Sequence, residues 1–176
     1  MTTTTSTAVR HTRIDSALGE LTLVADGDVL TGVYFERHWY PPAEDAIGPL
    51  VEAEADPLFT ETATQLADYL AGERTEFTVP IATHGDAFQE RVWSLLRDIP
   101  FGTTTTYGEL AERLGGRSLA QLVGRAVGRN PLSIVIACHR VVGKDGGLTG
   151  YAGGLDRKRK LLDLEQPGPA EAGRLF

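Results

Sequence analysis

The chain has 176 residues, of which 41% are hydrophobic, enough for one ordinary core or two small ones with little room for long disordered regions. Its formal net charge of −7 argues against a nucleic-acid-binding protein, because Lys and Arg side chains supply most of the non-specific affinity for phosphate. The charge is unevenly distributed, however. Residues 1–86 carry 4 Lys and Arg against 15 Asp and Glu, and residues 87–176 carry 13 against 9. A basic face on the second half is therefore possible, although two differently solvated surfaces would give the same counts.

Several classes of protein are excluded by what the sequence lacks. No apolar run approaches the roughly 18 to 20 residues that cross a bilayer, and the Thr-rich start at Met1 to Thr7 does not resemble a signal peptide. We therefore expect a cytoplasmic protein with no membrane partner. A single cysteine cannot form an internal disulfide, and four scattered histidines have no paired metal-ligand spacing, so we expect neither a metal nor another cofactor.

The first half of the chain predicts a small antiparallel sheet followed by a helix. Residues 11–36 alternate around the Asp26-Gly27-Asp28 turn, which is a hairpin signal. The proline-rich and acidic stretch from Trp39 to Pro57 has no sustained period and predicts a loop. Residues 59–70 then place their apolar side chains on one helical face, and Gly72 suits the end of that helix.

A domain boundary is expected near residues 83–86, where the charge changes sign, which gives domains of 1–86 and 87–176. The second domain begins with a helix over 88–98. Two capping boxes follow, Thr106-x-x-Glu109 and Ser118-x-x-Gln121, on either side of a Gly-Gly break. This pattern predicts a helix-turn-helix, although many such helix pairs only pack a protein together.

The chemically distinctive residues are Cys138 and His139, a nucleophile and a base that follow an apolar run. A lone cysteine in a cytosolic protein is most often a small buried apolar residue, so this pair alone has little weight. Neighbouring side chains also diverge, so we expect a water molecule to bridge the two. A buried carboxylate that orients the histidine would complete a thiolate-activating chain, and nothing nearby in the sequence must supply it.

From Phe88 to Glu165 the chain closely resembles the O6-alkylguanine-DNA alkyltransferases, also called methylated-DNA-protein-cysteine methyltransferases, of bacterial type. The first half resembles their amino-terminal domain less specifically, at Ile14-Asp15-Ser16, Gly19 and Leu21-Thr22-Leu23. The motifs that match in order and spacing are Phe88-Gln89, Val92-Trp93, Phe101-Gly102, Tyr107, Asn130-Pro131, Cys138-His139-Arg140-Val141, Gly150-Tyr151, Gly153-Gly154 and Leu161-Leu162 through Glu165. The resemblance implies an α/β, RNase H-like first domain and a mostly helical second domain with a winged-helix-like helix-turn-helix.

The resemblance also implies a function: DNA repair by stoichiometric, irreversible transfer of an alkyl group from O6-alkylguanine, or from O4-methylthymine, to Cys138. His139 would take the thiol proton through water while Glu165 holds the imidazole. The resemblance implies that the Tyr151 side chain and the Ala152 amide stabilise the departing guanine, and that the carbonyls of Cys138 and Val141 receive its exocyclic amine. It also implies that Asn130 braces the active-site turn. Arg140 is a further substrate-binding candidate.

Because alkylated O6 faces its paired base inside the stack, the nucleotide must leave the duplex. In the family a tyrosine, matched by Tyr107, helps turn the target phosphate, and an arginine fills the vacated space. This chain has Gln121 in place of that arginine and Ala137 in place of the usual proline. We expect transfer to survive both changes at a lower rate, since glutamine brings no charge and, as part of its capping box, would be occupied locally.

Two other interpretations stay open from the sequence. One is a non-catalytic module that binds alkylated DNA and recruits other repair proteins, against which the presence of Cys138, His139 and Glu165 argues. The other is a transcriptional regulator, which the absence of any additional DNA-binding domain disfavours. The expected partner is double-stranded alkylated DNA, bound by a monomer whose cooperative assembly on DNA the sequence leaves open.

Overall fold

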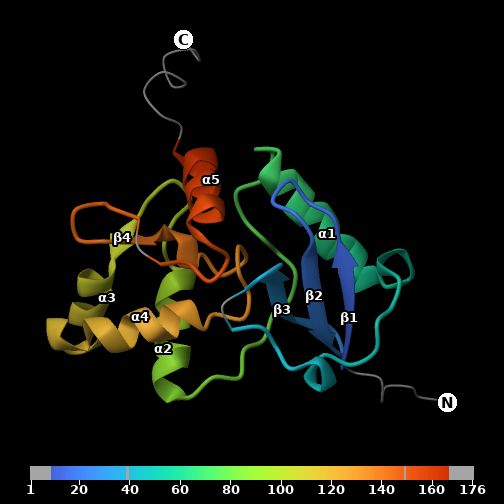
Figure 1. The fold of residues 1–176 in the computed structure, drawn as a ribbon, viewed down its shortest axis with the longest axis horizontal. Coiled ribbons are helices and arrows are strands. Elements are labelled where there is room, and N and C mark those ends of the chain that lie inside the picture. The colour runs from blue at the N-terminus through green and yellow to red at the C-terminus, as the bar shows by residue number, and fades with distance from the viewer. Residues whose placement is uncertain (1–8, 39, 149, 167–176) are drawn as a thin grey trace, which may run out of the picture. The chain divides into compact units, whose positions relative to one another are not determined.

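The computed structural model describes residues 9–38, 40–148 and 150–166, and in it the chain forms two compact units (Figure 1). One unit comprises the chain up to residue 84 together with residues 131–135, and the other comprises residues 85–130 and the chain from 136 onward. The Thr-rich start and Trp39, the first residue of the predicted loop, lie outside the described residues. Within the described ranges, no helix has the length and apolar character that a membrane span requires.

The first unit is built on a three-stranded antiparallel sheet in the order β1-β2-β3. Its strands are β1 (Val9–Ile14), β2 (Leu21–Asp26) and β3 (Val29–Phe35). Asp26 pairs with Val29, and Gly27 adopts a φ of 63°, a left-handed conformation that glycine tolerates without strain. The hairpin predicted around this turn is therefore confirmed.

Helix α1 (Pro57–Leu70) packs on this sheet through the buried side chains of Phe59 and Leu66. It begins where Pro57 follows Asp56, whose carboxylate accepts hydrogen bonds from the backbone N–H groups of Leu58 and Phe59 at 3.1 and 3.3 Å. The predicted helix is confirmed and begins two residues earlier than its apolar pattern suggested. The preceding loop contains two single-turn 3-10 helices, η2 (Glu44–Ala46) and η3 (Ala53–Ala55).

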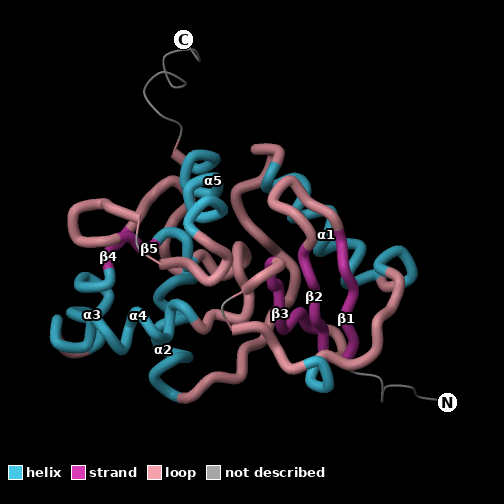
Figure 2. The backbone as a smooth tube through the Cα atoms, viewed as in Figure 1, coloured by secondary structure: helices cyan, strands magenta, loops and turns pink. Residues whose placement is uncertain are grey.

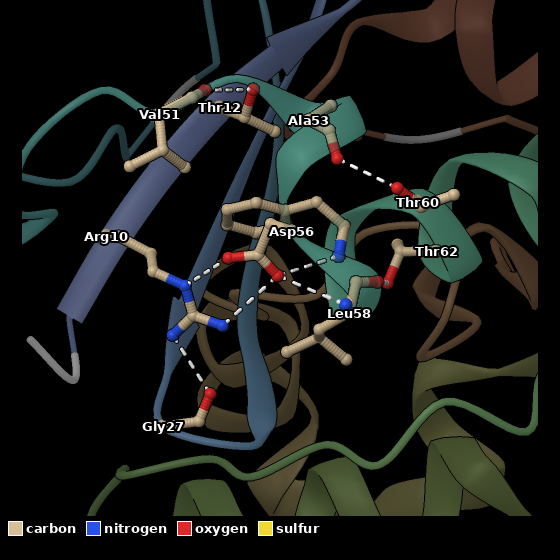
Figure 3. A network of polar contacts seen from close by, with 10 residues as sticks. Arg10, Thr12, Gly27, Val51, Ala53, Asp56, Leu58, Thr60 and Thr62 are labelled. Carbon is tan, nitrogen blue, oxygen red and sulfur yellow. Dashed lines mark hydrogen bonds and ion pairs between the residues drawn. The ribbon is translucent and has the colours of Figure 1, made fainter. Parts of the chain in front are cut away.

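An ion pair connects the start of α1 with the strands (Figure 3). Arg10 on β1 donates from Nε to Asp56 at 2.5 Å and from a terminal nitrogen to the carbonyl of Gly27 at 2.9 Å. Its guanidinium carbon also lies 5.4 Å from the centre of the Phe59 ring. Asp56 thus caps the helix and binds the arginine with the same carboxylate, which ties three elements of this unit together.

Residues 131–135 join the first unit, an arrangement that the sequence did not predict. The N–H of Val33 on β3 donates to the carbonyl of Pro131 at 2.8 Å, and the N–H of Ser133 donates back to Val33 at 3.3 Å. Ile134 then takes a positive φ of 74°, which is unusual for a β-branched residue. These two hydrogen bonds attach residues 131–135 to the edge of the first unit's sheet.

The second unit is mostly helical (Figure 2). Its helices are α2 (Ala87–Arg97), α3 (Tyr107–Leu114), α4 (Ala120–Gly128) and α5 (Leu155–Glu165). Two very short strands, β4 (Thr105–Thr106) and β5 (Val141–Val142), pair in parallel. The indole N–H of Trp93 on α2 donates to the carbonyl of Ala126 on α4 at 2.8 Å, within the apolar core between these helices.

Helices α3 and α4 form the predicted helix-turn-helix, but only one of its two predicted capping boxes exists. Thr106 and Glu109 cap the start of α3 reciprocally. At the second position a 3-10 turn, η4 (Arg117–Leu119), comes first, and α4 begins after Leu119 with no side-chain cap. The box predicted at Ser118 and Gln121 is therefore wrong, because the extra turn moves Ser118 out of the capping position. The predicted fold class, a small α/β domain followed by a mostly helical one, is confirmed.

Candidate active site

Cys138 opens a single 3-10 turn, η5 (Cys138–Arg140), and its side chain is almost completely buried. Two hydrogen bonds to the carbonyl of Ile136 hold the start of this turn. The N–H of Cys138 donates to the carbonyl of Ile136 at 2.7 Å, and the side-chain amide of Asn130 donates to the same carbonyl at 2.8 Å. Asn130 is itself 1% exposed, so the brace lies in a dry environment where a hydrogen bond is costly to lose.

The surroundings of the Cys138 sulfur act on its proton in opposite directions. Burial raises the pKa of the thiol above its usual value, since the thiolate would lose its hydration. Hydrogen bonds with the side chains of Asn130 and Tyr151, together with the positive charge of Lys158, lower this pKa and offset part of the rise. The resting protein therefore holds a neutral thiol whose ionised form already has stabilising partners.

His139 and Glu165 form a completely buried pair. Nε2 of His139 lies 2.8 Å from Oε2 of Glu165, and both side chains are inaccessible to solvent. Burial lowers the pKa of His139 below its usual value, and the hydrogen bond to Glu165 partly opposes this. The imidazole is therefore neutral at pH 7 and can accept a proton, and the Glu165 carboxylate stabilises the cation that results.

Arg140 completes this arrangement by gripping the same carboxylate. It donates from Nε to Oε1 of Glu165 at 2.8 Å and from a terminal nitrogen to Oε2 at 2.9 Å, a two-pronged geometry. A third N–H reaches the carbonyl of Ile99 at 2.5 Å, and the guanidinium carbon lies 5.7 Å from the centre of the Phe101 ring. These contacts are all with the protein. Arg140, expected as a substrate-binding residue, is thus placed to hold Glu165.

Lys158 is a member of this cluster that the sequence analysis missed. It is fully buried on α5, and its Nζ donates to the carbonyl of Gly150 at 3.3 Å and lies 6.0 Å from the centre of the Tyr107 ring. Burial lowers its pKa to about 8, and the nearby Cys138 opposes this shift. A helical signal was available: Lys158, Leu161 and Glu165 fall on one face of α5.

The remaining predicted residues occupy different positions. Tyr107, the first residue of α3, is half-buried, whereas Tyr151 and Ala152 are buried beside the cysteine turn. Val141 is buried on β5, and its N–H donates to the carbonyl of Cys138. Gln121 is exposed on α4 and is not part of the buried cluster. Among the described residues, no group of three or more His, Cys, Asp or Glu side chains is placed to hold a metal ion.

The arrangement therefore presents one sulfur nucleophile next to a neutral base that an ionised carboxylate supports. Such a set can deprotonate a thiol and let it attack an electrophilic carbon that approaches the sulfur. The buried Lys158 ammonium limits the cost of creating negative charge on the Cys138 sulfur. Since the thiol is almost completely buried, only a group that reaches beneath the protein surface can react with it.

Comparisons with known proteins agree over nearly the whole chain. Residues 9–83 match the family described as 6-O-methylguanine DNA methyltransferase, ribonuclease-like domain, and residues 87–167 match its DNA binding domain. The chain is 44% identical over 159 residues to the methylated-DNA–protein-cysteine methyltransferase of Mycobacterium tuberculosis, which covers 90% of this chain and 93% of the relative. A protein of the same name from Haemophilus influenzae is 40% identical over 162 residues, covering 91% and 88%. The crystal structure of Mycobacterium tuberculosis OGT in complex with DNA matches with a TM-score of 0.81 and 45% identity, covering 89% of this chain and 93% of that chain.

Proposed function

Because the chain belongs to the methylated-DNA–protein-cysteine methyltransferase family, we propose that it repairs DNA by transferring the alkyl group of O6-alkylguanine irreversibly to Cys138. The observation that carries this proposal is the buried chain of contacts from Arg140 through Glu165 to His139, directly beside the only cysteine. Each protein molecule is consumed by one reaction. We propose that it acts on duplex DNA as a cytoplasmic monomer.

The proposed reaction begins with proton transfer from the Cys138 thiol to His139 through a bridging water molecule. With Nε2–H donating to Glu165, Nδ1 is the nitrogen that accepts this proton, and the imidazolium that forms is stabilised by the carboxylate. The sulfur attacks the alkyl carbon, the S–C bond forms, and the C–O6 bond breaks with its electron pair moving to guanine. Sulfur ends as a neutral thioether, so nothing restores the thiol.

Charge that develops on the departing guanine requires donors in the pocket. We assign this role to the Tyr151 hydroxyl, directed to the purine, and to the Ala152 amide, directed to O6. The carbonyls of Cys138 and Val141 would accept the exocyclic amine. The Cys138 carbonyl already receives one hydrogen bond from Val141, which leaves its second lone pair for the base.

The target base must leave the duplex before this chemistry can occur, at a cost of a few kcal/mol. We propose that residues 87–176 perform this step as the DNA-binding and acceptor domain, with residues 1–86 as a separate domain. Tyr107, at the first turn of α3, would turn the target phosphate, and Gln121 on α4 would occupy the space that the base vacates. Since the capping box at Gln121 does not form, no cap occupies its amide.

Mass spectrometry tests the reaction and its acceptor together. Incubation with duplex DNA that contains O6-methylguanine should add one methyl group to the peptide that carries Cys138, and the Cys138→Ser variant should remain unmodified. Protein that binds this DNA and stays unmodified would instead be a non-catalytic lesion-recognition module. The same assay with O4-methylthymine measures whether this second lesion is a substrate.

A second experiment tests the flipping step. Replacing Gln121 with Arg should speed repair of duplex DNA more than reaction with free O6-benzylguanine, because only the duplex requires extrusion of a base. Equal effects on the two substrates would remove Gln121 from this step.

A further inference from the structure

The outer face of α4 carries charge one turn after Gln121. Val123, Ala126 and Val127 face the core of the unit, whereas Gln121 and Arg125 are exposed. Residues four apart on a helix are neighbours on one face, with their Cβ atoms about 6 Å apart. Gln121 and Arg125 therefore form a polar pair along the same exposed stripe of the helix.

The backbone of α4 lies beside Tyr107, one of the predicted site residues. A Cβ atom placed on Gly124 of α4 would meet the Tyr107 ring at 3.8 Å, so the helix backbone passes directly beside that ring. The Tyr107 ring in turn lies 6.0 Å from the Lys158 ammonium, whose charge acts on Cys138. Tyr107 therefore lies between the backbone of α4 and the buried ammonium that acts on the nucleophile.

The side-chain direction of a helix brings the Arg125 guanidinium toward Gln121. Cα–Cβ bonds in a helix tilt toward its N-terminus, so a long side chain covers the turn that precedes its own Cα. Within the part of the chain that the structure describes, Arg125 has no side-chain hydrogen bond or ion pair. Arg117, just before α4, is in contrast paired with Glu112. Arg125 therefore keeps its full capacity to bind an external anion.

On the premise that the chain repairs alkylated duplex DNA, we propose that Arg125 binds a backbone phosphate beside the extruded nucleotide and supplies the charge that Gln121 lacks. A guanidinium donates two parallel hydrogen bonds to a phosphate, which fixes the strand geometrically as well as electrostatically. Gln121 then needs only to fill space and hydrogen-bond to the unpaired base. Charge and space filling, which a single arginine can combine, are divided between two residues one helical turn apart.

The test compares Arg125→Gln with Arg13→Gln, a matched loss of charge on the exposed side of β1 in the other unit. Transfer rates are measured with a duplex containing O6-methylguanine and with free O6-benzylguanine, and the affinity for the duplex is measured over a range of salt concentrations. For Arg125→Gln we expect the ratio of duplex rate to free-base rate to fall about tenfold, and the slope of log affinity against log salt to lose about 0.9. Arg13→Gln should leave both values as in the wild type.

The exchange variant Gln121→Arg with Arg125→Gln gives the sharpest outcome. If charge on this stripe is what matters, moving it back by one turn should restore most of the duplex rate. The inference is overturned if Arg125→Gln behaves like Arg13→Gln, or if the exposed Leu122, replaced by Ala, is instead the residue whose loss slows the duplex reaction selectively. A wild-type protein that takes no methyl group from either substrate would overturn the proposed function itself.

Discussion

Each unit contains an arginine that grips one carboxylate with two nitrogens, and the two pairs differ in what surrounds them. In the first unit, Arg10 and Asp56 are 17% and 12% exposed, and their other partners are a turn carbonyl and the N–H groups that open α1 (Figure 3). In the second, Arg140 and Glu165 are 10% and 0% exposed, and the carboxylate also holds His139. The first pair joins structural elements, whereas the second connects the fold to the base beside Cys138.

The same contact geometry therefore predicts a different consequence in each unit. Removing a partner from the Arg10–Asp56 pair should cost stability only, because the partners described above are a turn carbonyl, the N–H groups that open α1 and the Phe59 ring, all within the first unit. Removing Glu165 should cost stability and reactivity together, because it leaves a buried guanidinium unpaired and a buried imidazole without support.

The Glu165→Gln variant should show the largest combined loss. We expect the transfer rate to fall by at least about 100-fold and the free energy of unfolding to fall by about 3 to 5 kcal/mol, since the neutral amide leaves Arg140 buried without a counter-charge. The rate is measured with free O6-benzylguanine and the stability by urea unfolding. Asp163→Asn, an exposed change on the same helix, is the control. A stable but inactive variant would separate the two roles that we assign to this carboxylate.

Lys158→Met should show a smaller loss of rate together with a gain in stability at pH 7. We expect about tenfold slower transfer, because the Cys138 thiolate loses a nearby positive charge. The pKa of Lys158 is about 8, so the wild-type advantage should be greatest below pH 8 and shrink as pH rises through it. Below that pH the charged ammonium destabilises the fold, and as pH rises from 8 toward the unfolded value the wild type should regain stability.

The exposed Lys160 on the same helix, replaced by Met, controls for the loss of charge. An unchanged pH profile of the rate in Lys158→Met would show that Lys158 only fills space in the core. Rescue by Lys158→Arg, which restores charge without a titration near pH 8, would support the electrostatic role.

The sequence predicted those features that depend on local signals. The hairpin at Gly27, the helix ending before Gly72 and the capping box at Thr106 follow from short patterns, and the structure confirms each one. The capping box predicted at Ser118 and Gln121 was wrong because Ser118 lies inside a 3-10 turn that precedes α4. The Ser-x-x-Gln spacing is the same whether or not such a turn is present. Nothing local distinguishes these two cases.

The contacts that build the candidate site are mostly long-range and were predicted less completely. The pairing of residues 131–135 with β3 depends on contacts between segments about one hundred positions apart, which periodicity does not encode. The resemblance to a known family supplied Glu165 and Asn130. The substrate contact expected for Arg140 stays a prediction, and the contacts of this residue with Glu165 and Ile99 were not predicted. Lys158 went unnoticed because its burial is visible only once α5 is packed.

Asp56→Ala should lower stability without slowing transfer, and so test the other side of the comparison. Loss of the helix cap and of the partly exposed ion pair should cost about 2 kcal/mol. The hydrogen bond from Arg10 lowers the pKa of Asp56, so this contribution should be present above the ordinary Asp pKa and disappear as pH falls through the lowered value. The matched control is Asp45→Ala in η2, an exposed carboxylate that has no side-chain partner among the described residues.

The two predicted capping boxes of the second unit should differ in what they contribute to stability, and this difference is the smallest that we expect. Thr106 accepts a hydrogen bond from the N–H of Glu109 at 3.1 Å, so Thr106→Ala should lower the free energy of unfolding by about 1 kcal/mol and Tm by about 2 to 4 °C. Ser118 caps no helix, and Ser118→Ala should leave Tm unchanged within error. Equal losses from the two variants would mean that α4 begins at Ser118 in solution. In that event the Gln121 side chain would be engaged by its own helix end, and Arg125 would be the only residue of the pair left to meet the DNA.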